Sequence, residues 1–163
     1  MNQTIQVRQV DYRNEQDRKA LISLLDMYAR DPMGGGTPLS CEVKSSLCNE
    51  LADFPGAYSA IAWLDGRAVG LINAFVGYST FKARPLMNVH DIAVIPESRG
   101  QGVGQALLGA LEVHARNMGC CKLTLEVLSG NTRGLRSYAQ FGFEHYALDP
   151  QMGHAMFMQK WLV

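Results

Sequence analysis

The sequence predicts a single α/β domain, built on a mixed, twisted β-sheet with helices on both faces. Segments with strand-like and helix-like hydrophobic periodicity follow one another in the order β α α β β β α β α β β. The chain has 163 residues, of which 47% are hydrophobic and 18% charged, a globular composition. A domain of about this length buries roughly 68–70% of the surface that its unfolded chain exposes, so it needs no disulfide or metal for stability. We therefore expect residues 1–163 to form one domain.

The first third of the chain predicts one strand and two helices. Residues 5–10 alternate between apolar and polar types, which is typical of a strand. Residues 14–30 carry apolar side chains at helical spacing, and a weaker helix is expected over residues 40–53. Between them, residues 31–38 contain three glycines and two prolines, which indicate a loop.

Three strands are expected in the middle of the chain. Residues 57–64 and 68–77 form the first two, and the Asp65-Gly66 pair between them is a strong hairpin signal. Residues 87–95 form an apolar third strand.

The last third predicts two helices, each followed by strands. The first helix runs over residues 102–118 and the second over residues 131–140, with a strand at 122–128 between them. Two closing strands are expected at residues 143–146 and 155–161.

Composition argues against several classes of function. The 15 basic and 15 acidic residues give a formal net charge of zero, and no Lys/Arg stripe is visible, so we expect no nucleic-acid partner. There is no run of about 18 apolar residues and no signal-peptide core, so we expect no membrane partner and a cytoplasmic location. The four cysteines have neither CxxC spacing nor a zinc-type interval to histidine, so we expect no metal.

A glycine-rich segment after the third of these strands is the most informative part of the chain. Gly100, Gly102 and Gly104 alternate where the strand has ended and the helix expected over residues 102–118 begins. Glycines allow backbone N–H groups to approach a ligand, and a helix N-terminus attracts anions, so a pyrophosphate would fit here. The segment lacks the Gly-Lys-Ser/Thr of a Walker A loop and the spacing of the dinucleotide fingerprint. The alternative is a tight turn that binds no ligand.

Two motifs in order resemble the Gcn5-related N-acetyltransferase superfamily. Arg99-x-x-Gly102-x-Gly104 resembles its acetyl-CoA motif. A second element resembles its Asn-x-x-Ala-x-x-x-Tyr-x-x-x-Gly-Phe pattern and comprises Asn131, Gly134, Tyr138 and the run Phe141-Gly142-Phe143. Gly134 departs from the pattern, which usually has alanine. The agreement in element order covers nearly the whole chain.

The resemblance implies acetyl-CoA as co-substrate. The strand before the glycine loop would splay from its neighbour, and its backbone at Ile92, Ala93 and Val94 would pair with the pantetheine arm. Asn131 would also bond that arm. Backbone N–H groups would hold the pyrophosphate, from the residues Arg99, Gly100, Gln101, Gly102, Val103 and Gly104.

The resemblance also implies direct attack of an amine on the thioester within a ternary complex. Tyr138 would protonate the leaving sulfur as general acid, and a strand N–H near residues 92–94 would stabilise the carbonyl oxygen. Otherwise Tyr138 is a core aromatic. His90 or Asp91 would act as base or hold the amine, or else both are structural; as strand neighbours, they are expected on opposite faces. Some relatives carry a Glu-Asp pair at the positions of His90 and Asp91. Glu126 is a third candidate.

The acceptor is less defined. The segments 78–85 and 153–160 resemble diamine acetyltransferases, which favours a small amine such as a polyamine or an amino acid, and a homodimer. The loop 31–37 and the helix after it would cover the acceptor pocket, where Asp31 and Glu42 could attract a cation. The alternatives are a protein or peptide N-acetyltransferase and a non-catalytic acyl-CoA-binding module.

Overall fold

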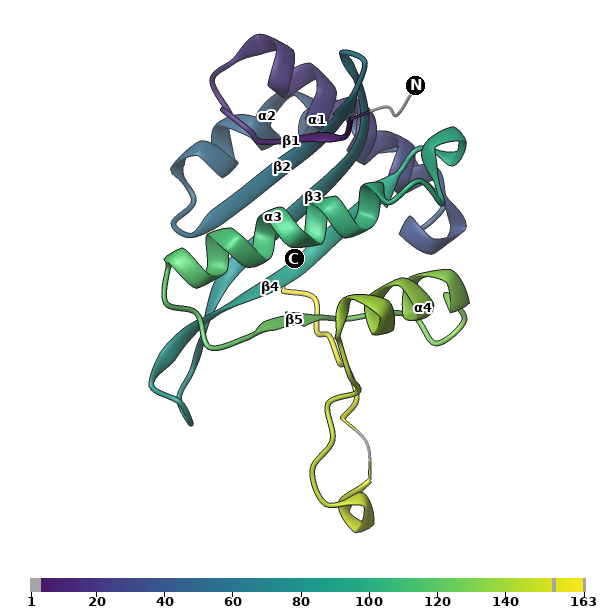
Figure 1. Cartoon of the computed structure of the whole chain (residues 1–163). Helices are drawn as coiled ribbons and strands as arrows, with labels where there is room; N and C mark the ends of the chain where they lie inside the picture. The colour runs from purple at the N-terminus through teal and green to yellow at the C-terminus, as the bar shows by residue number, and fades with distance from the viewer. Residues whose placement is uncertain (1–3, 154, 163) are drawn as a thin grey trace. The chain divides into compact units, whose positions relative to one another are not determined.

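The computed structural model describes residues 4–153 and 155–162. The chain divides into two compact units, residues 1–125 and residues 126–163 (Figure 1). The prediction of one domain over residues 1–163 stays a prediction.

The first unit contains a five-stranded mixed sheet. Its strands are β1 (Gln6–Gln9), β2 (Ala57–Leu64), β3 (Arg67–Ser79), β4 (Arg84–Val94) and β5 (Leu123–Leu125). They lie in the order β1-β2-β3-β4-β5, antiparallel except for the parallel β4/β5 pair. Asp65 and Gly66 turn the β2–β3 hairpin with φ of 48° and 79°, as the sequence predicts. The α/β fold class and the mixed sheet are therefore confirmed.

Three helices of the first unit begin close to their predicted starts. They are α1 (Glu15–Arg30), α2 (Cys41–Asp53) and α3 (Val103–Asn117), and short 3-10 turns lie at Pro32–Gly34 and Pro96–Ser98. The Asn14 side chain caps α1 by accepting a bond from the Asp17 N–H, and the Ser40 side chain caps α2 through the Val43 N–H.

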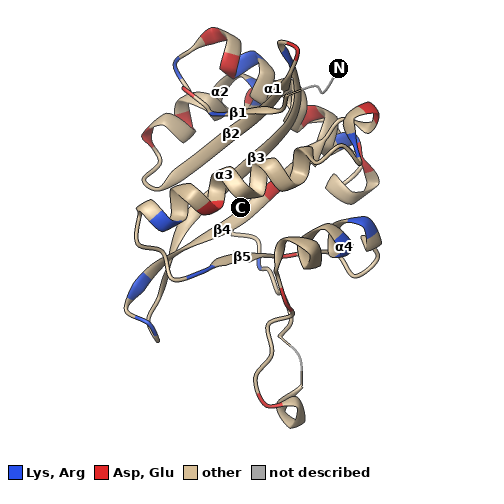
Figure 2. Cartoon of the chain, in the orientation of Figure 1, with Lys and Arg blue, Asp and Glu red and all other residues tan. Residues whose placement is uncertain are grey.

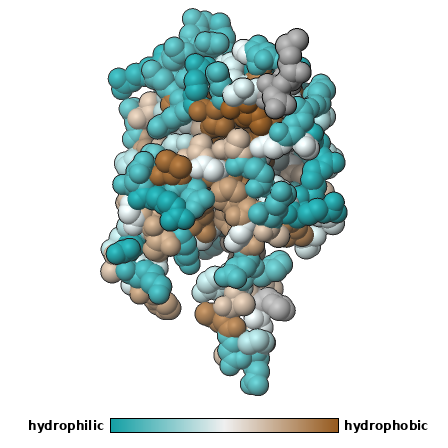
Figure 3. All heavy atoms as spheres, in the orientation of Figure 1, coloured by the Kyte–Doolittle hydropathy of each residue, from teal (hydrophilic) through white to brown (hydrophobic). Residues whose placement is uncertain are grey.

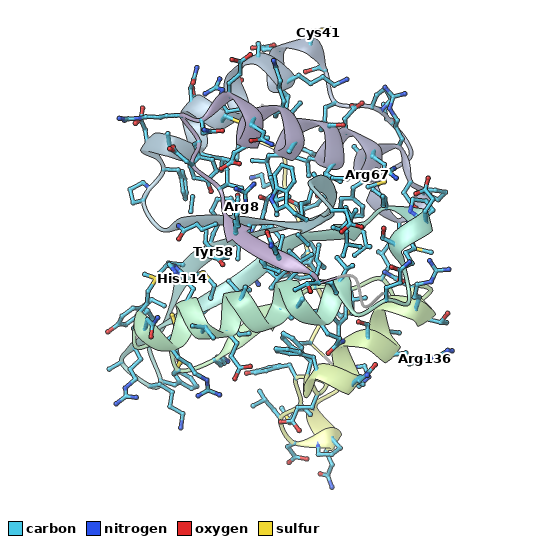
Figure 4. All side chains as sticks on the ribbon, turned by 45° about the horizontal axis from the view of Figure 1, so that its top comes forward. Arg8, Cys41, Tyr58, Arg67, His114 and Arg136 are labelled. Carbon is cyan, nitrogen blue, oxygen red and sulfur yellow. The ribbon has the colours of Figure 1, made fainter. Side chains whose placement is uncertain are left out.

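The helices cover opposite faces of the sheet (Figure 1). On the α3 face, the rings of Tyr58 and His114 stack at 4.3 Å, and Figure 4 shows these two side chains side by side. On the other face, Phe54 at the end of α2 packs edge-on against Phe75 of β3 at 5.5 Å. This face also carries the polar side chain of Asn73, two residues before Phe75 on β3.

The packing of α3 on the sheet is closest at Gly70 of β3. A Cβ there would lie 3.0 Å from the Val103 side chain and 3.2 Å from that of Leu107. Val103 and Leu107 are fully buried. The first turns of α3 are therefore seated directly on β3, which fixes where the glycine-rich segment before them emerges.

The second unit contains α4 (Thr132–Phe141) and a short 3-10 turn at Pro150–Met152. Asn131 caps α4, and Gly142 ends it with φ of 105°, close to the predicted range of 131–140. The sequence prediction is wrong for the closing strands: residues 143–146 form none, and neither do the described residues 155–162.

The physical reason is that alternation of side chains does not by itself create a strand, which needs a hydrogen-bonded neighbour. The apolar side chains of the last segment lie in solvent instead, with Phe157 at 78% and Trp161 at 77% exposure. Figure 3 shows apolar atoms at the surface of the second unit in the segment that follows α4. The strand expected at residues 122–128 is likewise shortened to β5.

Charges of both signs are scattered over the helices, and Figure 2 shows them interspersed on α1, α2 and α3. In the part of the chain that the structure describes, no helix combines the length and apolar character that a membrane crossing requires.

Candidate functional site

The glycine-rich segment joins β4 to α3. After β4 ends at Val94, a 3-10 turn leads to Gly100 and Gly102, whose φ angles are 76° and 85°. Such angles favour glycine because a Cβ strains the left-handed region. Gly102 is the N-cap of α3, so no side chain caps this helix, and its first turn holds no acidic residue.

The backbone N–H groups of this segment point to no internal acceptor. Among residues 4–153 and 155–162, no atom accepts a bond from the N–H groups of residues 100–104, whereas the Ala106 N–H already bonds the Gly102 carbonyl. The Arg99 N–H differs from the prediction because it donates to the Pro96 carbonyl at 3.3 Å. A helix start with unpaired N–H donors and glycine backbone fits a phosphate or pyrophosphate group.

The Arg99 side chain fastens this segment to two neighbours. Its Nε donates to the Val94 carbonyl at 3.0 Å, and its Nη2 lies 3.5 Å from Asp31 Oδ2. Asp31, expected as a possible cation ligand, is thus engaged with Arg99 and with the Met33 N–H. The Val94 carbonyl is similarly engaged, which leaves it less available to a pantetheine arm.

The edge of β4 changes character along its length. β5 pairs with β4 at Met87–Val89, and β4 then continues to Val94. Residues Ile92, Ala93 and Val94 pair with β3 on their other side. No β5 residue pairs with them, so the backbone groups on this edge are those that an extended ligand could meet.

A β-bulge lies where β5 pairing ends. Asn73 of β3 pairs with Asp91, but the next residue, Ala74, pairs with Val89, so His90 is the extra residue. The exposed His90 ring packs edge-on against Phe75 at 4.8 Å, and Asp91 bonds Asn73. The prediction that the two face opposite sides is therefore wrong, because Phe75 and Asn73 lie on the same face of β3 and the bulge resets the alternation.

Asp91 interacts with Asn73 and Tyr28, for which no role in the site is predicted. Asn73 Nδ2 donates to Asp91 Oδ2 at 3.0 Å. Burial raises the pKa of the Tyr28 phenol, and the negative charges of Asp91 and Asp31 raise it further. A usable signal existed for Asn73, since it is a polar residue inside an otherwise apolar predicted strand. No sequence signal pointed to Tyr28, because it fits the apolar stripe of the helix predicted over residues 14–30.

The second unit carries the remaining predicted site residues. Asn131 Oδ1 accepts the Gly134 N–H at 2.9 Å, so this oxygen caps α4 while the amide Nδ2 keeps its donors for other partners. The Tyr138 ring packs edge-on against Phe143 at 6.0 Å. Glu126 is exposed and follows the end of β5. Its expected place on the strand is therefore wrong, because β5 stops at Leu125.

No three His, Cys, Asp or Glu side chains gather as metal ligands within the described residues. That observation leaves the expectation of no metal a prediction.

The chain matches the sequence model of the acetyltransferase (GNAT) family over residues 21–143, which spans both units. The protein belongs to this family. Thialysine N-epsilon-acetyltransferase from Bos taurus is 38% identical over 68 residues, 42% of this chain and 39% of that protein. Streptothricin acetyltransferase from Streptomyces lavendulae is 35% identical over 85 residues, 52% of this chain and 43% of that protein. The chain therefore spans less than half the length of these curated relatives.

Solved acetyltransferase structures share the fold. The aminoglycoside N-acetyltransferase AAC(6′)-Iy in complex with CoA matches with a TM-score of 0.76 and 20% identity, over 98% of this chain and 97% of that one. A ribosomal-protein-alanine N-acetyltransferase from Brucella melitensis matches with a TM-score of 0.72 and 19% identity, over 97% and 100% of the two chains. The family resemblance drawn from the two motifs is confirmed.

Proposed function

We propose that this GNAT-family chain is an acetyl-CoA-dependent N-acetyltransferase that acetylates a primary amine of a small molecule. The observation that carries the proposal is the start of α3, where the N–H groups of residues 100–104 have no acceptor among the described residues. A 3-10 turn at Pro96–Ser98 connects this start to the β4 edge that β5 leaves unpaired. A diphosphate and an extended arm are the two parts of CoA that such neighbouring features fit.

The binding roles follow from these features. The N–H groups of residues 100–104 bind the pyrophosphate, and the positive end of the α3 dipole adds to their attraction. The β4 edge at Ile92 and Ala93 pairs with the pantetheine arm, and Asn131 Nδ2 donates to the same arm. Arg99 binds no phosphate in this account; it holds the loop through the Val94 carbonyl and Asp31.

The reaction is a direct transfer. The amine nitrogen loses its ammonium proton to His90 or a water and attacks the thioester carbonyl carbon. The carbon–sulfur bond breaks, CoA leaves as a thiol, and the nitrogen gives up a second proton as the amide forms, which restores the Tyr138 phenol. Tyr138 supplies the proton that the sulfur takes up, as general acid. A backbone N–H of the β4 edge donates to the carbonyl oxygen as its charge grows.

The acceptor is a cation at neutral pH, and the bulge on β4 provides for it. Asp91 and the exposed His90 lie on one face, where Asp91 attracts the ammonium group and His90 or a water accepts its proton. Phe75 beside His90 supplies an apolar surface for the body of the amine. Two relatives are named for thialysine and streptothricin, which supports amine-bearing small molecules as the first acceptors to test.

The test is a panel of polyamines, diamino acids and aminoglycosides with acetyl-CoA, read by thiol release and by a mass increase of one acetyl group. The proposal is supported if at least one amine is acetylated and if Tyr138→Phe lowers kcat for that amine by at least about 100-fold. Acetylation of peptides alone would replace the acceptor class. Saturable acetyl-CoA binding without transfer to any amine would leave an acyl-CoA-binding module instead.

The proposed setting is a cytoplasmic homodimer that needs no metal and binds neither nucleic acid nor membrane. Sedimentation equilibrium at micromolar concentration measures the assembly, and a monomer mass would contradict the dimer. Dialysis against EDTA should leave the rate of thiol release unchanged.

A further inference from the structure

A chain of hydrogen bonds runs through the buried face of the sheet and ends on Asp91. The Tyr12 hydroxyl donates to Ser59 Oγ at 2.8 Å, and Ser59 Oγ donates to Asn73 Oδ1 at 2.6 Å. Asn73 Nδ2 then donates to Asp91 Oδ2 at 3.0 Å. These residues come from the segment after β1 and from β2, β3 and β4, all in the first unit.

The two middle residues of this hydrogen-bond series, Ser59 and Asn73, are unusually buried for polar residues. Ser59 and Asn73 are directly paired across β2 and β3, and their exposures are 1% and 4%. Their neighbours in the core are almost all apolar. A buried polar pair costs free energy that an apolar pair of similar size would not, unless every donor and acceptor is used. Here the pair is bonded at both of its ends.

The donor and acceptor of every hydrogen bond in this series follow from the charge on Asp91. An ionised carboxylate only accepts, so the Asn73 group facing it is the amide NH₂. The Asn73 carbonyl then faces Ser59, whose hydroxyl donates to it, and the Ser59 oxygen is left to accept from Tyr12. Each member therefore fixes the orientation of the next, and with an ionised Asp91 the series delivers a donor to its Oδ2.

Asp91 is itself half-buried, and no described residue bonds its second oxygen, Oδ1. It sits at the bulge where His90 and Asp91 share one face. We propose that Asn73 is a positioning residue for acetyl transfer, held by Ser59 and Tyr12, which orients Asp91 so that Oδ1 receives the acceptor ammonium group. This inference rests on the proposed function, because it concerns the amine that the enzyme would acetylate.

A direct test that needs no activity follows the Asn73 side-chain amide by NMR in the full-length protein. Its two proton resonances, assigned by their loss in Asn73→Leu, should move at neutral pH in Asp91→Asn, because the carboxylate oxygen that accepts from Asn73 Nδ2 is replaced. Ser59→Ala should broaden or move them at neutral pH. Amide resonances that change in neither the Asp91→Asn nor the Ser59→Ala variant would overturn this series of hydrogen bonds.

A kinetic test measures the consequence for an acceptor found in the amine panel. Tyr12→Phe and Ser59→Ala should raise KM for the amine by about 2- to 10-fold each, with KM for acetyl-CoA unchanged. Tyr58→Phe is the matched control, since Tyr58 is a buried tyrosine next to Ser59 on β2 but faces α3. It should leave KM for the amine unchanged.

The effect should also depend on Asp91. In an Asp91→Asn background, Ser59→Ala should change KM for the amine less than 2-fold, because Ser59 acts on the amine only through the Asp91 carboxylate. Equal effects in both backgrounds, or an equal effect of Tyr58→Phe, would show a merely structural role and refute the inference. Absence of transfer to any amine by the unmodified protein would instead refute the proposed function, and the NMR result would still stand.

Discussion

Replacing Gly102 by valine tests the assignment of the pyrophosphate to the start of α3. Gly102 has φ of 85°, and a Cβ there would meet only the Ile5 side chain, at 3.9 Å. The variant is thus limited by backbone strain rather than by crowding in the free protein. Forcing an L-residue into the left-handed region costs roughly 1–2 kcal/mol, and a β-branched side chain is an outlier there.

This strain must appear in one of two measurements. If the empty loop relaxes, acetyl-CoA has to restore the strained backbone, and Kd rises by roughly 5- to 30-fold, since each 1.4 kcal/mol is a factor of ten. If the loop keeps its shape, the melting temperature falls by about 2–8 °C. In either case the added side chain also obstructs the approach of the phosphates to the N–H groups, which weakens binding further.

Calorimetric titration with acetyl-CoA and thermal unfolding of the same samples decide between these outcomes. Gly109→Ala is the matched control, because Gly109 lies inside α3 without positive φ and has open space around it. It should bind acetyl-CoA like the unmodified protein. A folded Gly102→Val with unchanged Kd would refute the pyrophosphate assignment.

Tyr138→Phe should lower kcat by roughly 10²- to 10⁴-fold with little change in the Kd of acetyl-CoA, and an unchanged kcat in the thiol-release assay removes this hydroxyl from the mechanism. Gly70→Val should push α3 off β3 and lower the melting temperature by about 2–12 °C, whereas Gly109→Ala should raise it slightly. Mainly the bond from Lys44 lowers the pKa of Asp26 from 3.8 to about 2. The ionised Asp26 carboxylate therefore contributes its full stabilisation above pH 3.8 and loses it as the pH falls toward 2. The difference in melting temperature between Asp26→Asn and the unmodified protein should vanish over that pH interval.

Local signals in the sequence predicted most of the first unit. The helix starts near residues 14 and 40, the Asp65-Gly66 turn and the glycines before α3 each depend on a few neighbouring residues, so the sequence alone locates them. Pairing partners are not local, and the two closing strands failed for this reason. Their alternating pattern is present, but the described residues form no ladder.

The candidate site shows the same division. The glycine loop and the position of His90 and Asp91 on β4 could be predicted from the order of motifs. Their shared face could not, because it depends on one extra residue in the β3–β4 register. The bond from Asn73 to Asp91 is likewise a cross-strand contact, which no spacing along the chain encodes.

Calorimetric titration of the purified protein with acetyl-CoA tests the central claim most directly. The account predicts saturable binding near one molecule per chain, weakened in Gly102→Val and retained in Tyr138→Phe. An absence of saturable binding at millimolar acetyl-CoA would contradict this prediction, because the N–H groups at the start of α3 and the β4 edge would then bind no CoA.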